Sequence, residues 1–360
     1  MNSGILYGGR SSGWAYYLRI SGALPLDWYR ELHMLAAVTG ASGHLGANLV
    51  RTLLDKKWKI RAVVRHDTRA LEGLDIECVP GDVLDEESLQ RVFTGVDVVF
   101  HLAGRISIVS WDRKEVEAVN ITGVRNVIKA CIATGVKRLV HTSSFHAHEQ
   151  EPLDEPLDES RPLLGRGRYP PYNHSKAEGE RIVKAAIREG LDAIIINPGG
   201  MLGPNDFKPS YFGTTILSLV SGKLLALVNA GLCWVDIRDV AEGMINACEH
   251  AEAGSKYILS GNWVSLVYIA QQVADITGVK TPPVVLPMWI AKSSAPLATF
   301  FDRIRGRRPL FTPISMKELE SNPHISYAKA NRELGYEPRP LSQTISDTVD
   351  WFQRNEFLNP

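Results

Sequence analysis

The segment YPPYNHSK (residues 169–176) contains a tyrosine and a lysine whose spacing could serve proton transfer. Tyr172 and Lys176 are four residues apart, so on a helix their side chains would share one face, about 6 Å apart. A tyrosine with its ordinary pKa of about 10 exchanges protons poorly at neutral pH, and adjacent positive charge lowers that pKa. Tyr169 has Asn173 at the matching position and lacks such a partner. We interpret Tyr172 as a candidate acid or base and Lys176 as the residue that lowers its pKa.

This spacing alone is weak evidence, since it arises by chance about once in two chains of this length. A glycine-rich loop, AAVTGASGHLGANLV, supplies context. It follows a strand-like run and opens a helical pattern, where glycines permit a tight turn, approach to a pyrophosphate and close helix packing. The N–H groups and positive dipole end of that helix would hold the anion. The loop residues expected to contact a dinucleotide are Gly40, Ser42, Gly43, His44, Leu45 and Gly46.

The second predicted strand ends AVVRHD and bears on the choice of cofactor. A site for NAD has a carboxylate at this position to bind the ribose 2′-hydroxyl, whereas Arg65 can pair with a 2′-phosphate. Arg61 and Arg69 would add positive charge. Asp67 could serve NAD instead if the loop were shifted. We therefore expect NADP(H) as the preferred cofactor, with NAD(H) as the alternative.

Short β-branched runs alternate with segments of helical period, such as 113–133 and 174–189. Apolar strands separated by helices predict a parallel sheet that is covered on both faces. The expected fold class is α/β, a Rossmann-type doubly wound parallel sheet with a smaller C-terminal substrate-binding region. The strands are expected at 35–39, 59–64, 75–79, 97–102, 137–142 and 191–196.

The same pattern divides the chain into regions. Residues 1–33 contain no long apolar core and are expected to be a poorly ordered extension, or to result from a start codon upstream of Met34, with a short interfacial helix as the alternative. The dinucleotide-binding core is expected at 34–200, with 234–260 returning to it. Residues 201–233 and 261–355 would form the substrate-binding region.

The composition excludes several classes of function. Forty basic and 40 acidic residues cancel, which argues against a nucleic-acid partner or a polybasic membrane anchor. Four scattered cysteines fit a reduced, cytoplasmic setting, and we expect no metal site. The apolar segment 284–301 is interrupted by Pro287, Lys292 and Pro296, so we expect no spanning helix. It would form a lid or core helix, or alternatively a surface in contact with a membrane.

From about residue 35 to 355 the chain resembles the extended short-chain dehydrogenase/reductase, or NAD-dependent epimerase/dehydratase, family. The resemblance rests on TGASGHLG, on the Tyr-Lys pair and on NITGVRNVIKACIATG at 120–135. The segments NPGGMLGP, WVDIRDVAEG and ISYAKANRELGYEPRPLSQTISDTVDWF are similar to the dihydroflavonol reductase-like and 3β-hydroxysteroid dehydrogenase-like branch. Such a member would use Tyr172 and Lys176 both in catalysis and in cofactor binding.

The resemblance also implies roles for residues that the chemistry alone does not single out. Ser144, with Ser143 as the alternative, would hold the substrate oxygen, and Asn120 would bind a backbone carbonyl or a water near Lys176. His146 and His148 replace the usual residues after this serine and would line a pocket or a loop. The further cofactor-binding residues implied are Asp82, Val83, Leu102, Ala103, Gly104, Pro198 and Gly199.

These observations predict an NADP-dependent oxidoreductase that reduces a carbonyl group, or oxidises a secondary alcohol, with tyrosine as the general acid or base. Aromatic residues in the later loops favour a lipophilic or ring-containing small molecule; they include Phe207, Tyr211, Phe212 and Trp289. The alternatives are an NAD-dependent sugar-nucleotide epimerase or dehydratase, and a non-catalytic regulator that senses a dinucleotide. The resemblance further implies a possible homodimer through 113–133 and 174–189.

Overall fold

Seven parallel strands form the central sheet of the computed structural model, which describes residues 34–165, 167–306 and 308–358. The strand order is β10-β6-β5-β4-β1-β2-β3, and the order reverses between β1 and β4, where a doubly wound sheet opens a crevice for ligands. The expected fold class is therefore confirmed. The strands are β1 (Leu35–Thr39), β2 (Lys59–Val64), β3 (Glu77–Pro80), β4 (Val98–His101), β5 (Arg138–Thr142), β6 (Ala193–Pro198) and β10 (Lys256–Leu259).

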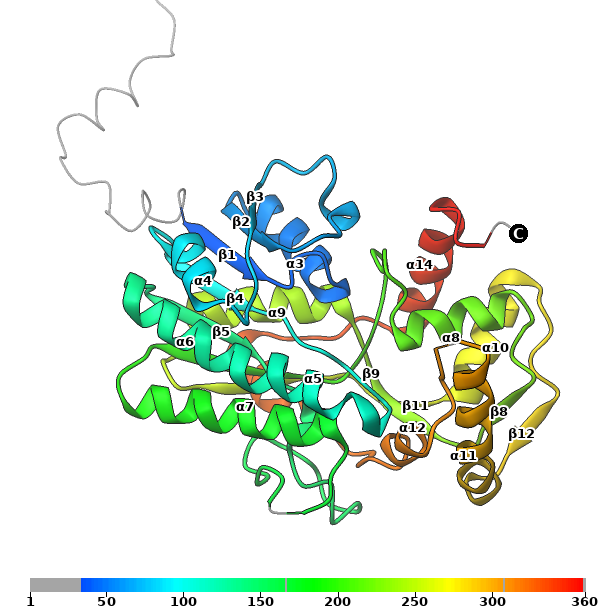
Figure 1. Cartoon of the computed structure of the whole chain (residues 1–360). Coiled ribbons are helices and arrows are strands. Elements are labelled where there is room, and N and C mark those ends of the chain that lie inside the picture. The colour runs from blue at the N-terminus through cyan, green and yellow to red at the C-terminus, as the bar shows by residue number, and fades with distance from the viewer. Residues whose placement is uncertain (1–33, 166, 307, 359–360) are drawn as a thin grey trace, which may run out of the picture.

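Helices cover both faces of this sheet (Figure 1). One hydrophobic cluster contains α3 (His44–Asp55) and α9 (Ile237–His250), together with Ala36 and Val38 of β1. The other contains Ala37 of the same strand, because successive side chains of a strand point to opposite faces. The helices of that second face are α4 (Glu86–Phe93), α6 (Gly123–Thr134) and α7 (Pro171–Arg188).

Some predicted boundaries differ from the structure. The strand expected at 75–79 begins at Glu77, because its pairing with β2 begins where Glu77 lies opposite Arg61. The helix expected at 113–133 is divided in three: α5 (Arg113–Glu117), a π-helical turn η3 (Ala118–Thr122), and α6. The short 3-10 helices are η1 (Arg69–Leu71), η2 (Ser110–Asp112) and η4 (Phe145–Ala147). The extension predicted at 1–33 lies outside the described residues.

The C-terminal part adds two small sheets and a separate core beside the carboxyl end of the main sheet (Figure 1). The described strands of the small sheets are β7 (Gly200–Leu202), β9 (Gly231–Asp236) and β11 (Trp263–Ser265), and β8 (Ala226–Val228) and β12 (Val284–Leu286). The helices are α8 (Tyr211–Val220), α10 (Leu266–Thr277), α11 (Met288–Ile304), α12 (Pro313–Glu318), α13 (Ala328–Leu334) and α14 (Leu341–Arg354). Within the described ranges, no helix is long and apolar enough to cross a membrane.

Ion pairs attach α14 and the preceding loop to the start of α9. The Arg238 guanidinium lies 2.7 Å from carboxylate oxygens of both Asp236 and Asp347. Arg339 lies 2.6 Å from Asp239. Because α9 also packs on the main sheet, these pairs hold the C-terminal helix in a defined position relative to the sheet edge.

A substitution at Phe352 of α14 would test the packing of the C-terminal core, because this side chain is completely buried among residues of α8, α10 and β9. We expect Phe352→Ala to lower the free energy of unfolding by about 3–5 kcal/mol, through lost burial and the cavity that remains. Urea denaturation would measure the loss. Phe300→Ala is the matched control, because that ring is 57% exposed and its removal should change stability by less than about 0.5 kcal/mol.

Candidate active site

The turn between β1 and α3 leaves no room for a Cβ at Gly40 or at Gly46. Gly40 has φ of 72°, and a Cβ there would lie 2.7 Å from the backbone nitrogen of Ala103. A Cβ on Gly46 would collide with the carbonyl oxygen of Gly40. Gly43 is exposed and is the N-cap of α3. The turn therefore presents the N-terminus of a 12-residue helix, which fits a pyrophosphate.

Three other residues of this predicted loop differ in their surroundings. Leu45 is buried in the hydrophobic cluster beneath α3, so its side chain belongs to the core. One ring nitrogen of His44 lies 3.1 Å from the carbonyl oxygens of both Gly203 and Pro204. Its imidazole therefore anchors the loop after β7. Ser42 is half-buried in the turn.

Arg65, at the end of β2, is the exposed cation of this edge. Its side chain is 67% exposed, and its guanidinium lies 3.8 Å from the Asp82 carboxylate. Asp82 also accepts a hydrogen bond from the backbone nitrogen of Leu84. The next residue, Val83, is buried and packs against the space left by Gly123. Arg65 and the Asp82–Val83 pair, which are predicted to bind the adenosine part of the cofactor, therefore lie close together.

The neighbouring charges do not act as expected from the sequence. Arg61 hydrogen-bonds to Glu77 and to backbone carbonyls near the end of α4, so it stabilises the sheet edge. Arg69 forms three hydrogen bonds with Asp67, two from its guanidinium and one from its backbone nitrogen, and they hold the pKa of that carboxyl at about 2. Arg61 and Arg69, which were expected to add positive charge here, are thus each paired with a carboxylate. Asp67 is likewise engaged by its neighbour.

The segment after β4 lies close to the loop and to α7. The backbone nitrogens of Leu102 and Ala103 donate to Thr39, to its carbonyl and its hydroxyl respectively. A Cβ on Gly104 would lie 3.4 Å from both the Lys176 Nζ and the Asn120 Oδ1. The small residue therefore allows the end of β4 to approach the lysine.

Asn120 lies in the π-helical turn and holds this segment through both of its amide atoms. Its Oδ1 accepts from the backbone nitrogen of Arg105, and its Nδ2 donates to the carbonyl of Arg105 and to the Ser175 hydroxyl. A Cβ on Gly179 would lie 2.9 Å from the backbone oxygen of Asn120. The widened turn and a glycine thus let α7 approach closely.

Tyr172, Lys176 and Ser144 meet at the carboxyl end of β5. Lys176 is buried and its Nζ donates to the carbonyl oxygen of Thr142 over 2.8 Å. The same nitrogen lies 5.9 Å from the centre of the half-buried Tyr172 ring. The side chain of Ser144 lies near enough to that of Tyr172 to favour the ionised form of the tyrosine, and its hydroxyl accepts from the backbone nitrogen of His146. The three residues predicted from the sequence are therefore brought together at this strand end.

Burial is the largest influence on the pKa values of Tyr172 and Lys176. It raises the pKa of Tyr172 to about 12, although Ser144 acts in the opposite direction and Glu318 adds to the rise. Burial also lowers the pKa of Lys176 to about 8. In the protein alone, Lys176 does not bring the pKa of Tyr172 below its ordinary value. Tyr172 therefore carries its proton at neutral pH.

A carboxylate from the C-terminal part also reaches this site. Glu318, at the end of α12, lies 2.7 Å from the Nδ1 of His146 and accepts from the Asn173 amide over 3.0 Å. Sequence reasoning missed Glu318, since it is far along the chain and belongs to no recognisable motif. His148 points elsewhere, 3.0 Å from the Lys256 Nζ. No metal-binding group of three such ligands occurs among the described residues.

Asn197, also missed, supports the serine from behind. Its Nδ2 donates to the backbone oxygen of Ser144 and to the buried carboxylate of Glu180. Pro198 ends β6, and a Cβ on Gly199 would lie 2.9 Å from the carbonyl oxygen of Cys233. Gly199 therefore allows β9 to pack against the end of β6.

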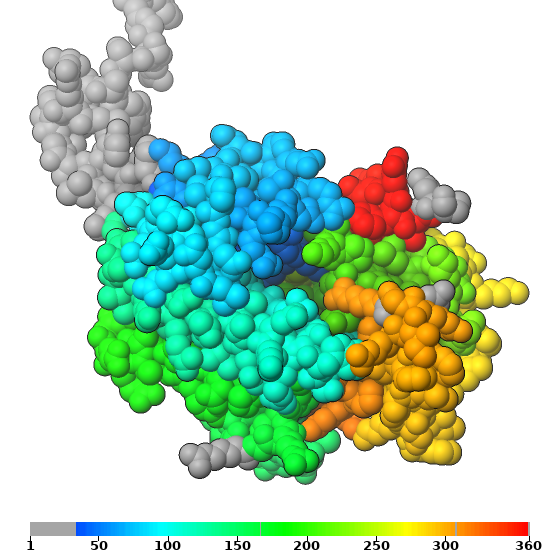
Figure 2. All heavy atoms as spheres, in the orientation of Figure 1, coloured from blue at the N-terminus to red at the C-terminus, as the bar shows by residue number. Residues whose placement is uncertain are grey.

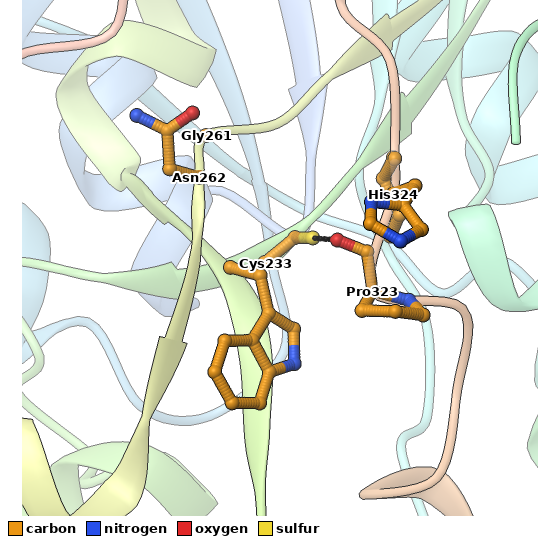
Figure 3. Close-up of a pocket in the computed structure, with 7 residues that line it drawn as sticks. Cys233, Gly261, Asn262, Pro323 and His324 are labelled. Atoms are coloured by element: carbon orange, nitrogen blue, oxygen red, sulfur yellow. Dashed lines mark hydrogen bonds between the residues drawn. The ribbon is translucent and has the colours of Figure 1, made fainter. Parts of the chain in front are cut away.

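The surface is hollowed between the blue and cyan dinucleotide-binding part and the green and orange C-terminal part (Figure 2). A separate pocket of about 340 Å³ lies between the β9–β11 pair and the segment 323–325 (Figure 3). Cys233 in this pocket donates to the carbonyl of Pro323, and burial raises the pKa of its thiol to about 11. None of the predicted site residues lines that pocket.

The aromatic residues expected around a substrate have other contacts. The Phe207 ring lies 5.0 Å from that of Trp351, and Phe212 lies 4.6 Å from Trp234. The ring of Tyr211 lies beneath the Arg308 guanidinium, and Trp289 is 70% exposed. Phe207 and Phe212 thus belong to aromatic pairs of the C-terminal part.

Comparisons with known proteins agree on one family. The sequence model of the NAD dependent epimerase/dehydratase family matches residues 36–260. The "Sterol demethylase protein B" of Methylococcus capsulatus is 35% identical over 332 residues, which cover 90% of this chain and 100% of that protein. A Synechocystis protein named as a candidate dihydroflavonol 4-reductase is 32% identical over 89% of this chain and 95% of its own. The crystal structure of gox2253 has 33% identity and a TM-score of 0.78, covering 89% of this chain and 98% of that one.

The buried ammonium of Lys176 generates a prediction about stability and pH. Its pKa is about 8 in the folded protein and 10.5 ordinarily, so the unfolded chain binds more protons between these values. The free energy of unfolding should consequently rise with pH, by ~2 kcal/mol between about pH 7 and pH 10. We expect Lys176→Met to remove this rise in urea denaturation at the two pH values. Lys129→Met, whose side chain is 63% exposed, should retain it.

Proposed function

The chain belongs to the NAD-dependent epimerase/dehydratase family, and from that premise we propose that it reduces the carbonyl group of a lipophilic, ring-containing small molecule with NADPH, or oxidises the corresponding alcohol with NADP⁺. It is an NAD(P)-dependent oxidoreductase; the preference for NADP(H) and the class of substrate are the proposal. The observation that carries it is the position of Lys176 beside the Tyr172 ring, where the Thr142 carbonyl holds the ammonium at the strand end that precedes Ser144.

The bound nicotinamide dinucleotide would supply the hydride. The backbone nitrogens at the start of α3 would bind its pyrophosphate, because Gly40 and Gly46 leave the turn open. Arg65 would pair with the 2′-phosphate. The exposure of its guanidinium and the engagement of Asp67 by Arg69 support NADP(H) over NAD(H).

In the reductive direction, Ser144 would donate a hydrogen bond to the carbonyl oxygen, and Tyr172 would give its proton to that oxygen. The raised pKa of Tyr172 ensures that the proton is present at neutral pH. Lys176, held by the Thr142 carbonyl, would bind the nicotinamide ribose and stabilise the tyrosinate that remains. Oxidation would require the reverse transfer, which positive charge near Tyr172 favours by lowering its pKa.

The substrate class rests on two kinds of support. The Methylococcus relative is named for sterol chemistry and the Synechocystis relative for a flavonoid reductase, and both names imply fused or linked rings. Glu318 of the C-terminal part contacts His146, which follows the strand end that carries Ser144, so the substrate would be enclosed by residues of both parts. Homodimerisation through α5, α6 and α7 stays a prediction.

Tyr172→Phe tests the acid. Loss of the hydroxyl should lower kcat for a ketone or aldehyde, found by a panel followed through NADPH absorbance, by roughly 10²–10⁴-fold. Binding of NADPH, followed by fluorescence, should change little. Tyr169→Phe is the matched control, since that hydroxyl bonds to Glu149 and should be dispensable. A loss of less than about tenfold for the Tyr172 variant would contradict the assignment.

Arg65→Ala tests the cofactor. The variant should weaken NADPH binding by more than about tenfold while leaving NADH binding nearly unchanged, because only NADPH carries the 2′-phosphate. Arg91→Ala, which removes an exposed arginine from α4, controls for net charge. Equal losses for the two cofactors would refute the role of Arg65. A wild-type preference for NADH would favour the epimerase or dehydratase alternative.

A further inference from the structure

Helix α11 has apolar residues on the face that it turns to solvent. Trp289, Leu297, Phe300 and Ile304 are 70%, 60%, 57% and 66% exposed. They recur at helical spacing and form one stripe, which we call the outer face of α11. The buried residues Ala291, Ala295 and Thr299 form the opposite stripe, which packs on the C-terminal part. A helix that is apolar on both faces is unusual at a protein surface and indicates that its outer face contacts something else.

The outer face extends beyond the helix. Val284 and Val285 of β12, the strand that leads into α11, are 46% and 45% exposed, and within α11 itself Phe301 is 47% exposed. Leu225, directly before β8, is 80% exposed, and β8 pairs with β12. In Figure 2 the segment from β12 to the end of α11, in yellow to orange, lies on the outer side of the C-terminal part.

Positive charge accompanies this face. Between residues 288 and 308 the sequence contains Lys292 and four arginines but only one acidic residue, Asp302. Lys292 pairs with Glu320. The described arginines of this segment are exposed and have no ion pair within the part of the chain that the structure describes; they are Arg303, Arg305 and Arg308.

We propose that the outer face of α11 binds the surface of an anionic lipid bilayer, with the helix lying in the interface. Apolar side chains would enter the acyl boundary, and Arg303, Arg305 and Arg308 would contact lipid phosphates. With 17 residues and three cations at its end, the helix suits lying on the bilayer rather than crossing it. A second copy of the chain that docked through the same segment would fit this face less well. Between residues 288 and 308 that copy would offer the arginines only one carboxylate, Asp302, to pair with.

The proposed surface adjoins the active-site cleft. The Arg303 guanidinium lies 4.8 Å from the centre of the Trp111 ring, which is itself 49% exposed. The Thr312 hydroxyl, shortly after α11, donates to the carbonyl of Ile108 over 2.7 Å. The segment that holds Ile108 and Trp111 begins at Arg105, which Asn120 binds beside Lys176. A lipophilic substrate could therefore pass from the bilayer to the cleft without crossing water, an inference that rests on the proposed function.

Flotation of the full chain with vesicles tests the surface. The protein should float with vesicles of phosphatidylcholine and phosphatidylglycerol, and much less with phosphatidylcholine alone or at high salt. The double variant Leu297→Glu, Phe300→Glu should bind more than about tenfold more weakly. Arg305→Gln should weaken binding about fivefold. Ile132→Glu, which replaces a 61% exposed residue of α6, should bind like the wild type.

The proposal would be overturned by the absence of binding to anionic vesicles, or by equal binding of the double variant, whose fold circular dichroism would verify. A dimer in sedimentation experiments without lipid, abolished by the double variant, would also overturn it in favour of a second copy. The enzyme assay separates this surface from the proposed function. The double variant should reduce a water-soluble ketone like the wild type, and Tyr172→Phe should still float with anionic vesicles. Flotation without any reductase activity would refute only the proposed function.

Discussion

The hydrogen bond between Lys176 and the Thr142 carbonyl is the interaction on which the candidate site depends. Through this bond the ammonium of Lys176 is held at the carboxyl end of β5, where the residue is only 7% exposed. Burial of such a charge is costly unless its donors are satisfied. The approach of α7 that makes it possible requires a glycine at 179, because a Cβ there would press on the backbone oxygen of Asn120. The packing of one helix therefore determines where the Tyr172 hydroxyl lies.

Neutral and paired groups surround that ammonium. His101 and His141 have ring centres 5.4 Å apart on adjacent strands, and burial lowers the pKa of His101 to about 3 and that of His141 well below its ordinary value. Both rings are consequently uncharged at neutral pH and cannot repel the lysine strongly. On the other side, Asn197 links the Ser144 backbone to the buried Glu180 carboxylate, which Lys184 pairs with at 3.0 Å. Ser144 and Lys176 are thus held by separate contacts: Asn197 donates to the backbone oxygen of Ser144, and Lys176 donates to the Thr142 carbonyl.

The two parts of the chain meet at this site rather than at a distance from it. Glu318 contacts both His146 and Asn173, and so connects α12 with the catalytic strand end and with α7. The hydroxyl of Thr312 makes a second link, to the loop after β4. A substrate between the parts would contact residues far apart in sequence. Its size and polarity are therefore selected by the way in which the parts pack.

The sequence by itself determined the parallel sheet, the glycine turn and the pairing of Tyr172 with Lys176. These follow from local rules: strand and helix periods, the space that a glycine leaves, and the four-residue spacing on one helix face. Arg65 could also be singled out from the sequence, because it directly follows the second predicted strand. The division of α5 from α6 was not predicted; the π-helical turn between them holds Asn120, whose amide bonds to Arg105 after β4 and to Ser175 of α7.

Only the tertiary structure decided which charges and aromatic rings are available. Arg61 and Arg69 have carboxylate partners, Phe207 and Phe212 pack on other rings, and Trp289 faces outward. Glu318 joined the site without any signal in the sequence, and Asn197 stood in a recognised segment, NPGGMLGP, without its role being predicted. The physical reason is that a side chain's pKa and exposure depend on neighbours from distant segments, and those neighbours are chosen by packing rather than by spacing along the chain.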